Sequence, residues 1–283
     1  MVTMTSATHS RQPIPWRHWQ GTPYWHRLAA GDRSVLMLDY DGTLAPFVRD
    51  RFHATLYTGV ARRLVRLAQH SRLRLVFVTG RQAHELLRLL PVGIAPEIWG
   101  SHGREHLLPD GRYHASALTA AQTSGLRWLN HSLGERGFAP SVEMKTGSMA
   151  LHTRGLSAAE EQELTSLAAE LFTHIASSGF NLLPFDGGVE IRAEGCSKAT
   201  ALESILSNEP EDAVAAYLGD DQTDEDAFEA LQERGLRVLV REAIRPTAAD
   251  LWLRPPNELL AFLDQWLAVL SEASSITLQD QAS

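Results

Sequence analysis

The most informative segment of this chain reads Val35-Leu36-Met37-Leu38-Asp39-Tyr40-Asp41-Gly42-Thr43. Four apolar residues in a row are typical of a strand that is buried on both faces of a parallel sheet. Asp39 and Asp41 follow directly, and side chains two positions apart at the end of a strand can point into one site. We interpret these two acids as catalytic carboxylates, one a nucleophile toward phosphorus and the other a general acid and base.

A calcium-binding loop is the main alternative for this acidic segment, and the spacing excludes it. An EF-hand loop that began at Asp39 would need glycine at its sixth position, where the chain has Leu44. Gly42 instead allows the backbone to turn sharply after the strand. The segment therefore favours phosphoryl-transfer chemistry.

Strand and helix patterns alternate on both sides of this segment. Further strands are predicted at 73–78, 97–100, 213–218 and 236–240, and helices at 60–68, 83–90, 198–206, 224–233 and 257–270. This alternation predicts an α/β fold with a parallel sheet.

The middle of the chain has a different pattern. A helix at 119–133 precedes a strand or hairpin at 142–153, and a second helix begins after Ser157, with Glu160 completing a capping box. A second hairpin follows at 180–192. This order predicts a small α+β domain inserted into the α/β domain. The predicted divisions are a leader of low regularity at 1–33, core at 34–113, inserted domain at 114–193, core at 194–272 and a flexible tail at 273–283.

The composition is that of an ordinary folded protein. Of 283 residues, 44% are hydrophobic and 21% are charged, which argues against wholesale disorder. A formal net charge of −8 argues against non-specific binding to nucleic acid or to an anionic membrane. A single cysteine, Cys196, excludes an internal disulfide, and we find no signal peptide or membrane span. We expect a soluble, cytoplasmic protein with no nucleic-acid and no membrane partner.

Two further polar segments follow predicted strands. Thr79-Gly80-Arg81 offers a hydroxyl and a backbone N–H that could hold a phosphoryl oxygen. Gly219-Asp220-Asp221-Gln222-Thr223-Asp224-Glu225-Asp226 holds five acids, which would repel one another unless some of them bind a cation. Oxygen ligands beside a phosphate substrate indicate Mg²⁺. Lys198 opens the helix after the inserted domain, where its charge adds to the positive helix end.

Together these segments resemble the four motifs of the haloacid dehalogenase (HAD) superfamily of phosphohydrolases. The resemblance implies a Rossmann-like core with a parallel sheet and an inserted α+β cap domain of the C2 type. It also implies an aspartyl-phosphate intermediate on Asp39 and one Mg²⁺ cofactor. The implied residues are Asp39 and Asp41 for catalysis, Asp39, Asp41 and Asp220 for the metal, Thr79, Gly80 and Lys198 for phosphate, and Asp221 and Asp224 as their support.

Three other strings are similar to those of the trehalose-6-phosphate phosphatase family. They are Gly100-Ser101-His102-Gly103, the run from Glu143-x-Lys145 to Leu151-His152-x-Arg154, and Val189-Glu190-Ile191-Arg192. This resemblance implies hydrolysis of trehalose 6-phosphate to trehalose and phosphate. It implies a trehalose-phosphate synthase of the same pathway as a partner. The substrate-binding residues that it implies are His102, Glu143, Lys145, Arg154 and Glu190.

Two alternatives stay open at this point. A phosphatase of another glycosyl phosphate, such as glucosylglycerol phosphate or sucrose phosphate, would have the same core motifs. A non-catalytic sensor of sugar phosphates could have the same fold, but we would expect it to have lost one of the acids, and Asp39, Asp41 and Asp220 are all present.

Overall fold

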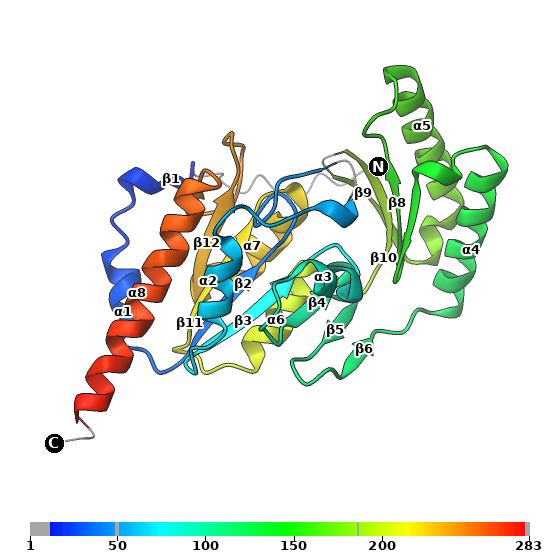
Figure 1. Ribbon diagram of the computed structural model, residues 1–283. Helices are drawn as coiled ribbons and strands as arrows, with labels where there is room; N and C mark the ends of the chain where they lie inside the picture. The colour runs from blue at the N-terminus through cyan, green and yellow to red at the C-terminus, as the bar shows by residue number, and fades with distance from the viewer. Residues whose placement is uncertain (1–11, 49–50, 186, 281–283) are drawn as a thin grey trace.

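The structure is a computed structural model that describes residues 12–48, 51–185 and 187–280 of the chain. The described residues form two units that lie side by side, a larger core and a smaller cap (Figure 1). The core is built from the segments before and after the cap, and the cap is a continuous insertion between them.

The core sheet has nine strands among the described residues, and β2 (Ser34–Leu38) lies near its centre. The sheet order is β1 (Ile14–Pro15), β13 (Leu251–Leu253), β12 (Gly235–Val240), β11 (Val214–Gly219), β2, β3 (Leu73–Val78), β4 (Glu97–Gly100), β5 (Glu105–Leu107) and β6 (Tyr113–Ala115). Pairing is parallel from β1 to β4, as the sequence predicts, and β5 and β6 add antiparallel strands at one edge. The α/β fold with a mainly parallel sheet is therefore confirmed.

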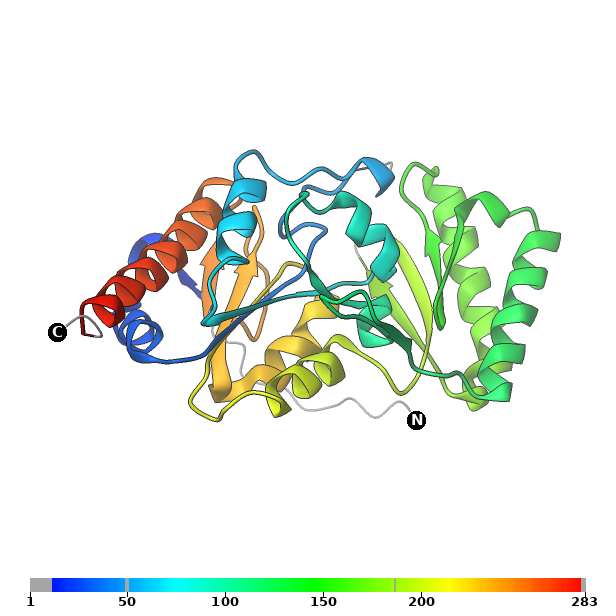
Figure 2. The same cartoon turned by 60° about the horizontal axis from the view of Figure 1, so that its bottom comes forward.

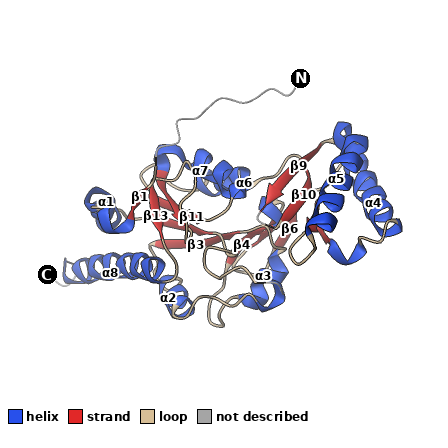
Figure 3. Cartoon of the chain, turned by 90° about the horizontal axis from the view of Figure 1, so that it is seen from above, coloured by secondary structure: helices blue, strands red, loops and turns tan. Residues whose placement is uncertain are grey.

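Helices cover both faces of this sheet (Figure 3). Because side chains alternate along a strand, Leu36 and Leu38 of β2 pack on one face, while Val35 and Met37 pack on the other. The first face is covered by α1 (Thr22–Ala30), α2 (Val60–Leu67), α3 (Ala83–Leu89) and α8 (Asn257–Asp280), and the second by α6 (Lys198–Ser207) and α7 (Glu225–Leu231). Burial on both faces explains the continuous apolar run before Asp39.

The cap is an antiparallel four-stranded sheet with two helices on one face. Its strand order is β7 (Val142–Lys145), β8 (Ser148–His152), β10 (Gly188–Ala193) and β9 (Phe180–Phe185), and its helices are α4 (Ala120–Glu135) and α5 (Ala158–Ile175). The capping box predicted from Ser157 and Glu160 begins α5. The helices lie on the side away from the core, so the open face of the cap sheet turns toward the core (Figures 1 and 2).

The leader is more regular than predicted. Residues 1–11 lie outside the described part of the chain, but β1 pairs with β13 and α1 packs on α8. Trp16 and Trp25 contact Phe262, and Trp25 also meets Trp266 edge-on. The aromatic residues of the leader thus pack against the core, because α8 presents apolar rings that they can cover.

Two boundaries also differ from the predicted divisions. β6 reaches Ala115 and is hydrogen-bonded in the core sheet, so the core extends past residue 113. Helix α8 continues to Asp280, where the sequence had suggested a flexible tail from residue 273. Among the described helices, none combines the length and the apolar character needed to cross a membrane.

Candidate active site

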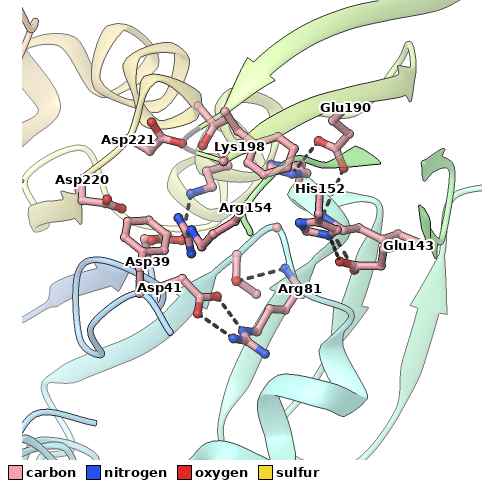
Figure 4. Close-up of a pocket in the computed structure, with 18 of the residues that line it drawn as sticks. Asp39, Asp41, Arg81, Glu143, His152, Arg154, Glu190, Lys198, Asp220 and Asp221 are labelled. Carbon is pink, nitrogen blue, oxygen red and sulfur yellow. Dashed lines mark hydrogen bonds and ion pairs between the residues drawn. The ribbon is translucent and has the colours of Figure 1, made fainter. Parts of the chain in front are cut away.

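The predicted residues meet in one cavity between the core and the cap. The cavity has a volume of about 250 Å³, with core acids on one side and cap side chains on the other (Figure 4). Its lining includes Asp39, Asp41, Thr79, Gly80, His102, Glu143, Lys145, Arg154, Glu190, Lys198, Asp220 and Asp221. Asp224 is fully buried and contacts Lys198 and the backbone beneath the cavity. The structure therefore brings together all the site residues that the sequence predicts.

Parallel strands explain why the core residues converge. Leu38 of β2 is in register with Leu218 of β11 and with Phe77 of β3, so the three strands end at the same edge. The residues that follow β2 and β3 therefore lie close to the acidic loop after β11, although these segments are far apart in the sequence. The backbone N–H of Asp39 donates to the carbonyl of Leu218 at 2.9 Å, which fixes the start of the acidic loop.

Lys198 is the cation at the centre of the core acids. Its Nζ lies 2.8 Å from Oδ1 of Asp39 and 2.6 Å from Oδ1 of Asp224, and all three groups are buried. Burial lowers the pKa of Lys198, but Asp224 and Asp39 outweigh it and keep the ammonium charged. Tyr217 also donates to Asp224, so Asp224 is fully engaged in holding Lys198.

The remaining charge favours a bound cation. Asp39, Asp220 and Asp224 offer carboxylate oxygens that lie within 4.8 Å of one another. Lys198 lies between Asp39 and Asp224, and Arg241 Nη1 lies 3.9 Å from Asp220. Burial, followed by repulsion from Asp39 and Asp224, raises the pKa of Asp220 well above its usual range. Burial likewise raises the pKa of Asp39 to about 7, although Lys198 opposes the shift. Burying two carboxylate charges is unfavourable unless a cation compensates them. The pair therefore fits a hard divalent ion, which prefers oxygen ligands.

Gly42 is required beside this pair of acids. Its φ of +81° is in the left-handed region, and a Cβ added there would lie 2.1 Å from Oδ2 of Asp220. The close approach lets the backbone of the first acidic loop reach the carboxylate of the second. This glycine therefore serves the site as well as the turn.

Asp41 is held by a residue that the sequence analysis quoted but did not assign to the site. Arg81 Nε and Nη2 donate to the two carboxylate oxygens of Asp41 at 2.5 and 2.6 Å. Arg81 follows β3, and its backbone N–H donates to the hydroxyl of Thr79 at 3.1 Å. The pairing fixes the orientation of Asp41, because two parallel hydrogen bonds leave little rotational freedom.

The cap side of the cavity centres on Glu190 of β10. Its carboxylate accepts from Oγ of Ser148 at 2.7 Å and from Nζ of Lys145 at 3.2 Å, and it lies 3.0 Å from Nε2 of His102 in the core. Burial raises the pKa of Glu190, but the hydrogen bond from His102 and the charge of Lys145 outweigh it and hold that pKa well below its usual range. Burial lowers the pKa of His102 to about 4, so this imidazole is neutral near pH 7.

His102 adopts an unusual backbone conformation at the point where core and cap meet. Its φ is +54° and that of Ser101 is +48°, both in the left-handed region that non-glycine residues rarely adopt. Nδ1 of His102 is buried and has no hydrogen-bond partner among the described residues. Backbone strain and an unpaired ring nitrogen of this kind are typical of a binding site.

Several further lining residues were not predicted, among them His152, Phe185 and Phe47. His152 Nε2 lies 2.8 Å from Glu143, and the ring of Phe185 packs edge-on against His152. The guanidinium of Arg154 lies 5.2 Å from the centre of the Phe47 ring, which joins cap to core. An isolated His or Phe gives no signal by itself in a sequence, although His152 lies inside one of the strings that we quoted.

Comparison with known families identifies the chain. The family model described as trehalose-phosphatase matches residues 37–252, which include the whole cap and most of the core sheet on both sides of it. The chain belongs to the trehalose-phosphatase family. The resemblance seen in the sequence is thereby confirmed.

Curated relatives of this family member are longer proteins. A trehalose-phosphate phosphatase of Mycobacterium marinum is 31% identical over 252 residues, which cover 84% of this chain and 63% of the relative. An uncharacterized glycosyl hydrolase of Mycobacterium tuberculosis is 31% identical over 262 residues, which cover 87% of this chain and 19% of the relative. The chain thus spans only part of the length of these relatives.

Solved structures share the fold. The C-terminal domain of the Candida albicans trehalose-6-phosphate phosphatase aligns with a TM-score of 0.77 at 18% identity, covering 92% of this chain and 99% of that one. A haloacid dehalogenase-like hydrolase of Bacillus subtilis aligns with a TM-score of 0.60 at 15% identity, covering 82% and 99%. The predicted HAD-type core with an inserted cap is confirmed at the level of the fold.

Proposed function

We propose that this chain is a phosphatase that hydrolyses trehalose 6-phosphate to trehalose and phosphate. The observation that carries the proposal is the cavity itself, which joins a phosphoryl-transfer set on the core to a set of sugar-binding groups on the cap. Family membership and the named relatives support the same substrate. We place the reaction in the cytoplasm, next to a synthase that would supply trehalose 6-phosphate.

Asp39 is the proposed nucleophile. Lys198 holds one of its oxygens, and Thr43 Oγ1 contacts the other at 3.4 Å, so the carboxylate is oriented before substrate arrives. Attack on phosphorus forms an aspartyl phosphate and releases the sugar. Lys198 also compensates the negative charge of the transferred group, and Thr79 and Gly80 lie beside it in the cavity.

Asp41 is the proposed general acid and base. Arg81 pairs with its carboxylate, which can take a proton from the water that hydrolyses the aspartyl phosphate. Donating a proton to the departing sugar oxygen requires the protonated form. In the first step, therefore, we expect the carboxyl group of Asp41 to leave Arg81 and turn toward the substrate.

A magnesium ion is the proposed cofactor. Asp39 and Asp220 would hold it, together with Asp41, and Asp221 and Asp224 would support the loop. When bound, the ion reduces repulsion between the anionic nucleophile and the anionic substrate. Sugar hydroxyls would be bound by Glu143, Lys145, Glu190 and His102, and Arg154 would lie near the phosphate.

Phosphate release from trehalose 6-phosphate tests this proposal. With Mg²⁺ we expect steady turnover, and with EDTA we expect none until excess Mg²⁺ is restored. Full activity in the chelator would reject the metal, and absence of release with Mg²⁺ would reject the activity. A protein that binds trehalose 6-phosphate without releasing phosphate would be a sensor instead.

A further inference from the structure

Both connections between core and cap meet at one buried side chain. Arg104 follows β4 and is 4% exposed. Its Nη1 donates to the carbonyl of Ser116 at 3.4 Å, in the connection that enters the cap. Its Nη2 donates at 3.1 Å to the carbonyl of Ala193, which ends β10, and at 2.9 Å to that of Glu194, which begins the connection that leaves the cap. The backbone N–H of Ser116 also donates to the carbonyl of Arg104 at 2.9 Å.

The same side chain supports the turn between β7 and β8. Gly147 has a φ of +84°, and a Cβ added there would lie 2.2 Å from Nε of Arg104. The carbonyl of Gly147 accepts from the backbone N–H of Ala193 at 2.9 Å, which joins this turn to the end of β10. Arg104, the β7–β8 turn and the end of β10 therefore pack together in one cluster.

This cluster lies next to the proposed sugar-binding groups, but Arg104 does not line the cavity. Lys145 ends β7 just before the turn, and Glu190 lies on β10 just before Ala193. Arg104 itself is not part of the cavity lining. Its partners are backbone carbonyls of the two connections and of the end of β10, the strand that carries Glu190.

We propose that Arg104 is the positioning residue that fixes the pivot of the cap and thereby places Glu190 and Lys145 over the core site. Other contacts across the cavity join side chains, as His102 joins Glu190, or run from one side chain to one carbonyl, as Gln82 donates to Met144 at 3.2 Å. Such contacts can separate when the cap opens for substrate. Arg104 binds both connections where the two units join, so it can stay in place through that motion.

The inference rests on the proposed function, because it concerns recognition of the sugar. Its test compares Arg104→Met with the wild-type enzyme on trehalose 6-phosphate and on p-nitrophenyl phosphate. Loss of the Arg104 contacts should lower kcat/KM for the sugar phosphate by about 10- to 100-fold, mainly by raising KM. Misplaced binding groups weaken the binding of the substrate and of the transition state by similar amounts. Activity on p-nitrophenyl phosphate should stay within about twofold, since the core site is intact. Arg104→Lys should recover part of the loss, because an ammonium can still donate to these carbonyls.

Arg72→Met is the matched control. Nη2 of Arg72 also donates to three carbonyls, those of Leu28, Ala29 and Gly31, but these lie in the leader far from the cap connections. This variant should leave the ratio of the two activities unchanged. Equal losses on both substrates in Arg104→Met, or no loss on either, would overturn the proposal, and so would failure of Arg104→Lys to recover any selectivity.

The substrate assignment can fail separately. It is read from the wild-type enzyme before any variant is made. If the wild type prefers another disaccharide phosphate, the comparison runs on that substrate, and a selective loss in Arg104→Met still supports the pivot. Hydrogen exchange gives a second measurement. The amide of Ser116 should exchange faster in Arg104→Met than in the wild type, and an unchanged rate would contradict a pivot fixed by Arg104.

Discussion

Burial sets the behaviour of the single residues in the core site. Asp39 and Asp220 are almost completely removed from solvent. Lys198 lies 2.8 Å from Asp39, and Arg241 Nη1 approaches Asp220 at 3.9 Å. Burial raises the pKa values of both acids. Such acids favour cation binding and at the same time destabilise the cation-free fold, which makes both effects measurable.

Asp39→Asn should fold normally and lose turnover. An amide is a poor nucleophile and a weaker ligand for a cation, so we expect kcat to fall at least about 1000-fold, or about 4 kcal/mol. Phosphate release under saturating substrate measures the change. Asp110→Asn is the control, because Asp110 is exposed and pairs with Arg112 in a surface turn. Near-normal activity in Asp39→Asn would contradict the mechanism.

Metal-free stability should fall as the pH rises. The pKa of Asp39 is raised to about 7 in the folded protein, so ionisation is harder there than in the unfolded chain. The stabilising contribution is present below about pH 4 and is lost as the pH rises through about 7. The melting temperature in EDTA should therefore drop between pH 5 and pH 8, and Mg²⁺ should raise it more at pH 8.

Asp220→Asn should stabilise the metal-free protein at pH 8. Removing one buried charge relieves repulsion with Asp39, and we expect a gain of about 1–3 kcal/mol in the free energy of unfolding. The same variant should lose the stabilisation by Mg²⁺. Urea unfolding with and without the ion measures both effects, and a destabilised variant that still responds to Mg²⁺ would show that Asp220 has another role.

Sequence patterns revealed the core acids but not their partners. Asp39 and Asp220 each follow an apolar run, which is a local signal. The pairing of Asp41 with Arg81 joins residues that follow two different strands, and its two bonds exist only once the sheet has formed. The contact of Phe47 with Arg154 similarly depends on how the cap lies on the core. Such residues become visible only in the structure.

Burial determines which strands of the core sheet can be predicted from the sequence. Strands with apolar residues on both faces, such as β2 and β11, were predictable because their burial is written in the sequence. The three residues of β6 are all exposed, and β5 alternates over only three, so neither has a hydrophobic pattern long enough to predict. They form because β4 offers hydrogen-bonding groups to β5, and β5 in turn offers them to β6.

Glu190 on β10 provides the test of the cap. Loss of a buried, charged hydrogen-bonding group costs about 2–4 kcal/mol, so Glu190→Ala should lower kcat/KM for trehalose 6-phosphate by about 30- to 1000-fold. The loss on p-nitrophenyl phosphate should be much smaller, because that substrate cannot reach β10. Glu163→Ala, on the exposed face of α5, is the control. Equal losses on both substrates would show that Glu190 supports the fold instead.

The start of α5 offers a stability test that is independent of catalysis. Ser157 Oγ accepts from the backbone N–H of Glu160, and the Glu160 side chain accepts from the backbone N–H of Ser157. Ser157→Ala should reduce the free energy of unfolding by about 1 kcal/mol, as measured by urea titration. Ser166→Ala, at an exposed position within the same helix, should leave stability unchanged or slightly higher. Equal effects would argue against the capping box.

At the scale of the whole molecule, the cavity combines groups that are distant in the sequence. The insertion of the cap between β6 and α6 places the sugar-binding candidates opposite the strand ends of the core. The order of elements predicted two units, but the closed arrangement arises from tertiary contacts such as the one between His102 and Glu190. Similarly, the aromatic residues of the leader meet their partners on α8 only in the folded chain, so the sequence alone does not reveal this packing.

The central claim is that the cap selects trehalose 6-phosphate for hydrolysis by the core. The most direct test is kcat/KM with Mg²⁺ for trehalose 6-phosphate, sucrose 6-phosphate, glucosylglycerol phosphate and glucose 6-phosphate. We predict that trehalose 6-phosphate exceeds each of the others by about 100-fold or more, because buried charged groups reject a substrate that leaves them unpaired. A comparable or higher value for any of the other three would contradict the claim.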